Sequence, residues 1–321
     1  MPLPFLSTFT GTLFLDPIPA NAHRHTLFFA NREVLPSYHV QLHDMIEVGL
    51  DVRPFIQNLG WTFLLDHPFS SVICPDAVRF FYSNLRFTQL SSRFLTTLVF
   101  GNLLTIPVVE VERSLYIPAI GENLADASEL ALFNFDISAE FRQLTGQFPG
   151  PNLSLPVSAL LPSLRALHFY ISRVFLPRSG DFNLITPVEL WVLVHAAHGV
   201  PLSYADLFFG HAISYCDVNV TSPLPFGPLI TTFLSRIRVN IQPFRSITPS
   251  VYLTADDVMD LLEIAVEGEN GDGHVVVLSS SSDSDDGNGG DVPELAPFAA
   301  ALQALYGSDS DGEGAQSQGE E

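Results

Sequence analysis

The sequence predicts a mainly α-helical domain, made of one or two helical subdomains, that carries one small β-hairpin and is followed by a disordered acidic tail. Three observations lead to this fold class. Apolar residues recur at helical spacing in several segments that begin near a proline. A Gly-Asn pair, Gly101–Asn102, separates two short apolar runs, which is typical of a tight hairpin. Residues 254–321 hold 17 acidic residues and no basic one, so this part repels itself and stays extended.

In the N-terminal half, helices are predicted at 34–50, 52–61, 75–85 and 107–118, and the hairpin at 94–106. The clearest helix begins at Pro75, because proline suits a first helical position. Its apolar residues Val78, Phe81, Tyr82 and Leu85 share one face. The hairpin ends at Pro107, where the next predicted helix begins, and Pro118 ends that helix.

A breaker with three prolines and two glycines, residues 146–156, separates a second set of helices. These are predicted at 162–177, 186–199, 203–217, 225–239 and 254–268. Thr186 and Glu189 form a capping-box pattern, and Gly199 ends that helix. The predicted organisation is a flexible leader (1–26), a helical subdomain with the hairpin (27–145), a linker (146–156), a second helical subdomain (157–266), and the acidic tail (267–321) with a short helix at 293–306.

Several segments of the chain follow one another in a specific order. They are "GWTFLLDHP", "CPDAVRFFYSNLR", "TTLVFGNLLTIPVVEVERSLYIP", "LLPSLRALHFYISRVFLPRSG", "TPVELWVLVHAAHGV" and "LPFGPLITTFLSRIRV". This order, from about Phe28 to Ile241, resembles the plant transposon protein domain, a group close to the first reading frame of Athila-type plant retrotransposons. The resemblance implies an origin in a plant mobile element, and it brings no established catalytic residues.

Composition excludes several kinds of chemistry. All 14 basic residues are arginines, so the chain has no lysine for a Schiff base or for a phosphate-binding loop. The Asp-Thr/Ser-Gly triplet of retroelement proteases and the Tyr-x-Asp-Asp turn of reverse transcriptases are absent. Two distant cysteines, Cys74 and Cys216, cannot form a zinc knuckle and are expected to be reduced thiols. We therefore predict a non-enzymatic protein without a cofactor.

Two metal sites are possible alternatives to a non-enzymatic protein. In both cases the residues concerned also have a simpler structural role. A nuclease site could draw on Asp66, Asp76, Glu110 and Glu189, which are more simply helix caps and surface residues. A zinc site could draw on His195, His198, His211 and Cys216, although such loose spacing is usual for core and surface residues. We predict no metal.

A nucleic-acid interface would need cations along one face, because phosphate neutralisation supplies most non-specific affinity. The candidates are Arg165, Arg173, Arg178, Arg236, Arg238 and Arg245. The competing interpretation pairs these arginines with Glu189, Asp206 and Asp181. A formal net charge of −21 favours that interpretation.

The tail contains the most specific short signal, "HVVVLSSSSDSDDG" at 274–287. Its apolar run, Val275, Val276, Val277 and Leu278, is suited to adding a strand to the sheet of another protein. The acidic residues Asp283, Asp285 and Asp286 follow it and would face a basic rim. This pattern resembles a motif that binds the small ubiquitin-like modifier. Ser280 and Ser282 each precede an aspartate by three residues, so they are candidate phosphosites that would strengthen the acidic flank.

The function predicted from these features is protein–protein interaction or self-assembly. The expected partner is the small ubiquitin-like modifier or a sumoylated protein, with nucleic-acid binding through an arginine face and a metal-dependent nuclease as alternatives. No apolar run reaches the roughly 18 residues of a membrane span. The N-terminus lacks the basic region of a signal peptide. A nuclear or cytoplasmic protein that is not secreted is therefore expected.

Overall fold

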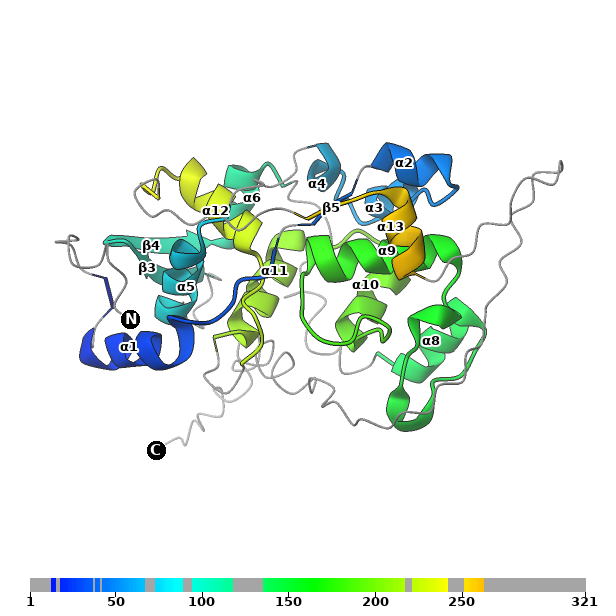
Figure 1. Cartoon of the computed structure of the whole chain (residues 1–321), viewed down its shortest axis with the longest axis horizontal. Coiled ribbons are helices and arrows are strands. Elements are labelled where there is room, and N and C mark those ends of the chain that lie inside the picture. The colour runs from blue at the N-terminus through cyan, green and yellow to red at the C-terminus, as the bar shows by residue number, and fades with distance from the viewer. Residues whose placement is uncertain are drawn as a thin grey trace, which may run out of the picture.

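The structure is a computed structural model that describes residues 13–15, 18–36, 38–40, 42–66, 73–88, 94–117, 135–216, 221–241 and 251–262. Within these residues the chain is mainly helical with a small antiparallel sheet, which confirms the predicted fold class (Figure 1). The predicted acidic tail, residues 267–321, lies outside the described residues. None of the described helices has the length and apolarity that crossing a membrane requires.

The N-terminal half contains α1 (Ile18–Arg24), the π-helix η1 (His25–Phe29), β1 (Tyr38–Val40), α2 (Leu42–Glu47), α3 (Arg53–Asn58), α4 (Phe63–Asp66), α5 (Pro75–Asn84), β2 (Arg86–Thr88), β3 (Phe94–Val99), β4 (Asn102–Pro107) and α6 (Val108–Leu115). The C-terminal half contains α8 (Ile137–Thr145), the 3₁₀ helices η2 (Pro151–Leu153) and η3 (Val157–Ala159), α9 (Pro162–Tyr170), the π-helix η4 (Ile171–Phe175), α10 (Pro187–His198), α11 (Tyr204–Ser214), α12 (Gly227–Arg236), β5 (Val251–Leu253) and α13 (Ala255–Leu261). Proline stands in the first turn of α3, α5, α9, α10 and α12, where its fixed φ favours the helix.

β3 and β4 form the predicted hairpin, but its turn lies one residue earlier than expected. Val99 pairs with Asn102, so the turn residues are Phe100 and Gly101, with φ of 46° and 77°. Positive φ at both positions matches a type I′ turn. The side chain of Asn102 donates to the carbonyl oxygens of Val99 and Phe100. The Phe100 ring packs edge-on against Phe80, at 5.4 Å between centroids, which offsets the cost of a left-handed phenylalanine. β2 adds a third strand along β3.

The segment predicted as one helix at 34–50 is divided in the structure, so that prediction is wrong for its first part. Tyr38–Val40 form β1, which pairs in parallel with β5, and the helix α2 begins only at Leu42. The rings of His39 and Tyr252 stack across the two strands at 5.1 Å. The partner strand lies more than 200 residues away in the sequence. Local periodicity could not reveal this pairing, because it depends on a distant segment.

Residues 18–26, which we expected to belong to a flexible leader, are helical and packed. The guanidinium of Arg24 donates to the Ser83 carbonyl oxygen at 2.8 Å. The ring of His25 stacks on Phe80 at 4.5 Å between centroids. Figure 1 shows α1 beside α5 at the end of the molecule that also carries β3 and β4. These contacts with α5 stabilise a helix that has little intrinsic tendency to form alone.

One apolar core runs through the described chain and includes residues on both sides of the predicted linker at 146–156. The indole of Trp61 packs edge-on against Phe175 and Tyr204, at 5.8 and 5.3 Å, and its N–H donates to the Leu202 carbonyl oxygen at 2.8 Å. Leu155, inside the linker, is itself buried. The helices that precede and follow the linker therefore share a core.

Candidate functional site

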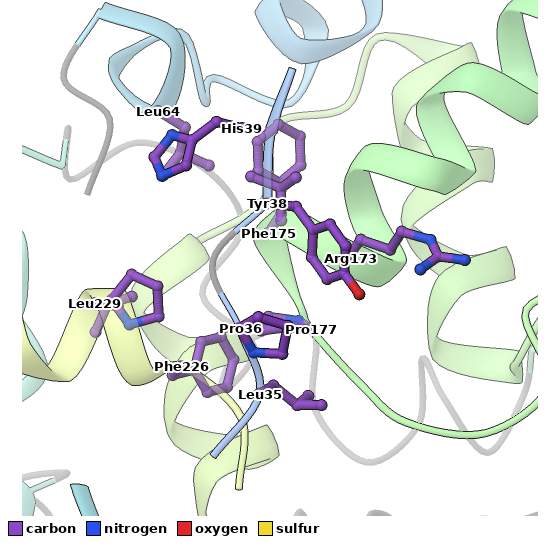
Figure 2. Close-up of a pocket in the computed structure, with 12 residues that line it drawn as sticks. Leu35, Pro36, Tyr38, His39, Leu64, Arg173, Phe175, Pro177, Phe226 and Leu229 are labelled. Carbon is purple, nitrogen blue, oxygen red and sulfur yellow. The ribbon is translucent and has the colours of Figure 1, made fainter. Parts of the chain in front are cut away.

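A small pocket lies where β1 meets η4 and the start of α12 (Figure 2). Its lining residues are Leu35, Pro36, Tyr38, His39, Leu64, Arg173, Val174, Phe175, Pro177, Phe226, Pro228 and Leu229. Its volume is about 50 Å³. Since one water needs about 10–15 Å³ on this measure, the pocket has room for a few waters or for part of one apolar side chain.

Close backbone packing holds the walls of the pocket together. The N–H of Leu35 donates to the Leu224 carbonyl oxygen at 2.9 Å, which places the Leu35–Pro36 segment beside the start of α12. Gly227, the first residue of α12, leaves no room for a side chain. An added Cβ would lie 2.9 Å from methyl groups of both Ile73 and Val34. The pocket is therefore built by contacts between segments that are distant in sequence.

Arg173 is the cation of the pocket. Its guanidinium lies 3.8 Å from the centre of the Phe182 ring and 5.4 Å from that of Tyr38. Burial lowers the pKa of Arg173, although an arginine stays protonated near neutral pH. Among the described acidic residues, none forms an ion pair with Arg173. Figure 2 shows the guanidinium pointing away from Phe226 and Leu229.

The remaining polar groups of the pocket favour an apolar ligand. Burial lowers the pKa of His39, which favours its neutral form. Tyr38 presents its ring to Arg173. A pocket with aromatic and aliphatic walls and one cation beside it suits an apolar side chain of a peptide with an acidic neighbour. Tyr38 and His39 were not found by sequence reasoning, because the sequence placed them inside a helix.

A buried ionic cluster lies at the start of α10, and it is the strongest electrostatic feature among the described residues. The carboxylate of Glu189 accepts hydrogen bonds from Arg178 Nε at 2.6 Å and from the Thr186 N–H at 2.7 Å. His168 Nε2 lies 3.2 Å from the same carboxylate. Burial alone would raise the pKa of Glu189, but attraction and hydrogen bonds from His168 and Arg178 outweigh it and lower that pKa to about 2. The cluster holds the start of α10 against His168 of α9 and against Arg178, which follows η4, so its role in the described structure is to join these segments.

The candidate arginines are used in different ways. Arg165 and Arg178 are buried, and they donate to the Leu160 carbonyl oxygen and to Glu189 respectively. The pairing of Arg178 with Glu189 matches the interpretation that competed with a nucleic-acid face. Arg236 lies over the Tyr116 ring at 4.9 Å, Arg238 is exposed, and Arg245 lies outside the described residues. A single face built from all these arginines is excluded, because buried guanidinium groups cannot reach a phosphate backbone.

The candidate carboxylates of the nuclease site do not gather at one place among the described residues. Asp76 pairs with Arg79 at 3.0 Å within α5, and Glu110 pairs with Arg113 within α6. Glu189 belongs to the buried cluster, and Asp66 is the last residue of α4.

The candidate zinc ligands also make local contacts. His195 Nδ1 lies 2.8 Å from the Trp191 carbonyl oxygen, and His198 lies beside Gln143. His211 Nε2 lies 3.4 Å from the Pro177 carbonyl oxygen, and the Cys216 thiol donates to Ala212. Over the described ranges, no three His, Cys, Asp or Glu side chains are placed to share a metal.

Two arginines that the sequence did not single out cap the C-terminal end of α11. Arg24 donates to the Cys216 carbonyl oxygen at 2.6 Å, and Arg32 donates to that of Tyr215 at 3.1 Å. Both guanidinium groups also lie over the ring of Phe29, at 5.1 and 5.5 Å. Cations at the C-terminal end of a helix satisfy its free carbonyl groups and its dipole. Their role is structural, and it becomes visible only when Arg24 and Arg32 are seen beside the end of α11.

The structure does not describe the candidate residues of the tail, which are Val275 to Leu278, Ser280, Ser282, Asp283, Asp285 and Asp286.

Comparisons of the chain with models of protein families, with curated proteins and with solved structures found no match.

Proposed function

We propose that this chain is a non-enzymatic protein, derived from a plant transposable element, that acts by binding other proteins. The observation that carries the protein-binding role is the pocket beside β1, where apolar walls and the guanidinium of Arg173, which lies over the Phe182 ring, suit a peptide side chain with an acidic neighbour. The transposon origin rests on the order of the sequence segments between about Phe28 and Ile241.

The tail supports the same role from the sequence. Val275 to Leu278 form a short β-prone run, and the acidic flank begins five residues later, at Asp283. In strand addition, backbone hydrogen bonds supply affinity and alternate side chains enter pockets of the partner. The partner we propose is the small ubiquitin-like modifier, free or attached to another protein. Phosphorylation of Ser280 and Ser282 adds charge to the flank and raises the rate of association.

A titration of the full chain against isotope-labelled small ubiquitin-like modifier tests the tail. We expect saturable NMR shifts along one strand and the adjacent helix edge of the modifier. A variant with Val276→Ala and Val277→Ala should lose these shifts. A matched variant with Leu302→Ala and Leu305→Ala, which removes apolar surface elsewhere in the tail, should keep them. Absence of shifts with the unsubstituted chain at millimolar concentration would refute the proposal.

The pocket is tested separately with a library of short peptides that pair an apolar residue with an acidic neighbour. Leu229→Lys places a charge in the pocket and should abolish binding of the selected peptides. Arg173→Gln should weaken peptides with the acidic neighbour more than peptides with alanine at that position. Equal binding by all three proteins would show that the pocket is not the site. Binding to DNA or RNA that weakens steeply with salt would instead favour a nucleic-acid role.

A further inference from the structure

The two cysteines of the chain lie in different surroundings, and they are not joined in a disulfide. Cys74 is 5 % exposed, and burial raises the pKa of its thiol, which favours the protonated form. Cys216 follows α11 and is only half-buried, and its thiol donates to the Ala212 carbonyl oxygen at 3.4 Å. Since a thiol reacts as a thiolate that reagents can reach, Cys216 is the better placed of the two to react.

Two guanidinium groups hold the backbone around Cys216. Arg24 donates to the Cys216 carbonyl oxygen at 2.6 Å, and Arg32 Nη1 donates to that of Tyr215 at 3.1 Å. Among the described residues, no carboxylate forms an ion pair with either arginine. The positive charge at this end of α11 is therefore available to stabilise a negative charge on the nearby sulfur.

Arg32 also interacts with the thiol itself and keeps one donor in reserve. Burial lowers the pKa of Arg32, and Cys216 is one of the groups whose charge acts in the opposite direction, so the two side chains lie within electrostatic reach. Arg32 is 7 % exposed, and its Nε donates to the Ser222 carbonyl oxygen at 2.6 Å. Its Nη2 is buried and has no acceptor in the described part of the chain. Because a buried charged donor without an acceptor destabilises a fold, such a group needs an explanation.

Two local effects oppose a thiolate at Cys216, and neither is large. The C-terminal end of a helix disfavours negative charge, but the two guanidinium groups already satisfy the carbonyl oxygens at this end of α11. The hydrogen bond to Ala212 favours the protonated thiol, but a thiol is a weak donor. Tyr82 and Tyr215 belong to the same cluster of interacting groups, and burial raises the pKa of both phenols, so they add no negative charge near neutral pH.

We propose that Cys216 is a site of oxidation by hydrogen peroxide, at which Arg32 stabilises first the thiolate and then the oxidised sulfur. The thiol gives its proton to solvent, and the thiolate attacks one oxygen of the peroxide. An S–O bond forms, the O–O bond breaks, and the hydroxide that leaves takes up a proton to become water. The sulfur loses two electrons, which the peroxide gains. The product is a sulfenic acid, whose oxygen extends beyond the sulfur and supplies the acceptor that Arg32 Nη2 lacks.

Trapping of the sulfenic acid on the full chain tests this site. The reduced protein is treated with hydrogen peroxide and dimedone, which tags sulfenic acids, and the tagged cysteines are quantified by mass spectrometry. We expect tagging of Cys216 to be at least about tenfold faster than tagging of Cys74, the internal control. Arg32→Gln should slow tagging of Cys216 by about tenfold, whereas the matched variant Arg113→Gln, which changes an exposed arginine of α6, should not. Equal tagging of both cysteines, or equal rates in the two variants, would overturn the proposal.

A second measurement uses the unsubstituted chain and does not depend on the stability of a variant. The rate at which iodoacetamide alkylates Cys216 is followed against pH and compared with the rate in a synthetic peptide of residues 210–218. Partial burial lowers the plateau of this rate but leaves its midpoint, which reports the thiolate, unchanged. We expect a midpoint about one pH unit lower in the full chain than in the peptide, because the peptide lacks Arg32. A midpoint equal to that of the peptide, or above it, would overturn the proposal.

Discussion

Replacing Glu189 by glutamine is expected to destabilise the domain by about 3–5 kcal/mol, the usual cost of breaking a buried ion pair on one side. Glu189 is 2 % exposed, and its carboxylate binds Arg178, His168 and the backbone of Thr186. Glutamine keeps the shape of the side chain and a carbonyl oxygen for Thr186. It removes the negative charge, so the guanidinium of Arg178 stays buried without its counter-charge.

The lowered pKa of Glu189 gives a second way to estimate how much its carboxylate stabilises the fold. It falls from 4.5 to about 2 in the folded chain. At about 1.4 kcal/mol for each tenfold change in proton affinity, this corresponds to about 3 kcal/mol of stability. A depressed carboxyl pKa stabilises the folded state above pH 4.5, and the contribution is lost as the pH falls toward 2. The natural chain should therefore lose this contribution to stability as the pH falls from 4.5 toward 2. Glu189→Gln lacks the carboxyl group and should not show this part of the pH dependence.

Urea unfolding followed by tryptophan fluorescence measures this effect, because Trp61 and Trp191 are both buried. The chain offers a matched control in its other capping box, where Asp257 is exposed and, among the described residues, its carboxylate is hydrogen-bonded to Thr254. Asp257→Asn removes the same capping chemistry without a buried ion pair, so it should cost clearly less. A loss below about 1 kcal/mol for Glu189→Gln, or a loss equal to that of Asp257→Asn, would refute the reasoning.

Three further outcomes follow from local geometry. Gly227→Ala should destabilise the domain by about 1–3 kcal/mol in urea unfolding, because its Cβ would press on Ile73 and Val34, and an unchanged midpoint would contradict that contact. Gly101→Ala should cost about 1–2 kcal/mol, since φ of 77° disfavours a side chain, and equal stability would contradict the turn. Burial, with repulsion from a nearby arginine, lowers the pKa of His25 from 6.5 to about 4, so stability should fall as the pH drops from 6.5 to 4. His25→Phe should flatten this slope, and an identical pH profile would refute the assignment.

Elements with strong local signals were predictable from the sequence. The helix from Pro75 and the capping box of Thr186 and Glu189 appear as predicted, because proline geometry and side-chain caps act within one turn of a helix. The hairpin was also predictable, although its turn moved to Phe100–Gly101. The turn lies one residue earlier because of a tertiary contact. The ring of Phe100 packs on Phe80 and stabilises a backbone conformation that phenylalanine rarely adopts.

The candidate site could not be predicted in the same way. Tyr38 and His39 follow a helical spacing, yet they form a strand because β5 supplies hydrogen-bond partners from the far end of the domain. Arg173 and Leu229 line one pocket although no local pattern joins them. Likewise, the sequence left two possible roles for Arg178, binding of nucleic acid or pairing with Glu189. Only the tertiary structure shows that it pairs with the Glu189 carboxylate.

Sequence alone therefore established the mainly helical class, most helix starts, the hairpin and the contrast between an arginine-containing domain and an acidic tail. These properties depend on composition and on interactions within a few residues. The tertiary structure decided which arginines are buried, where the β1–β5 pair forms, and that residues on both sides of the linker share one core. Those outcomes depend on contacts between distant segments, whose energies no local pattern contains.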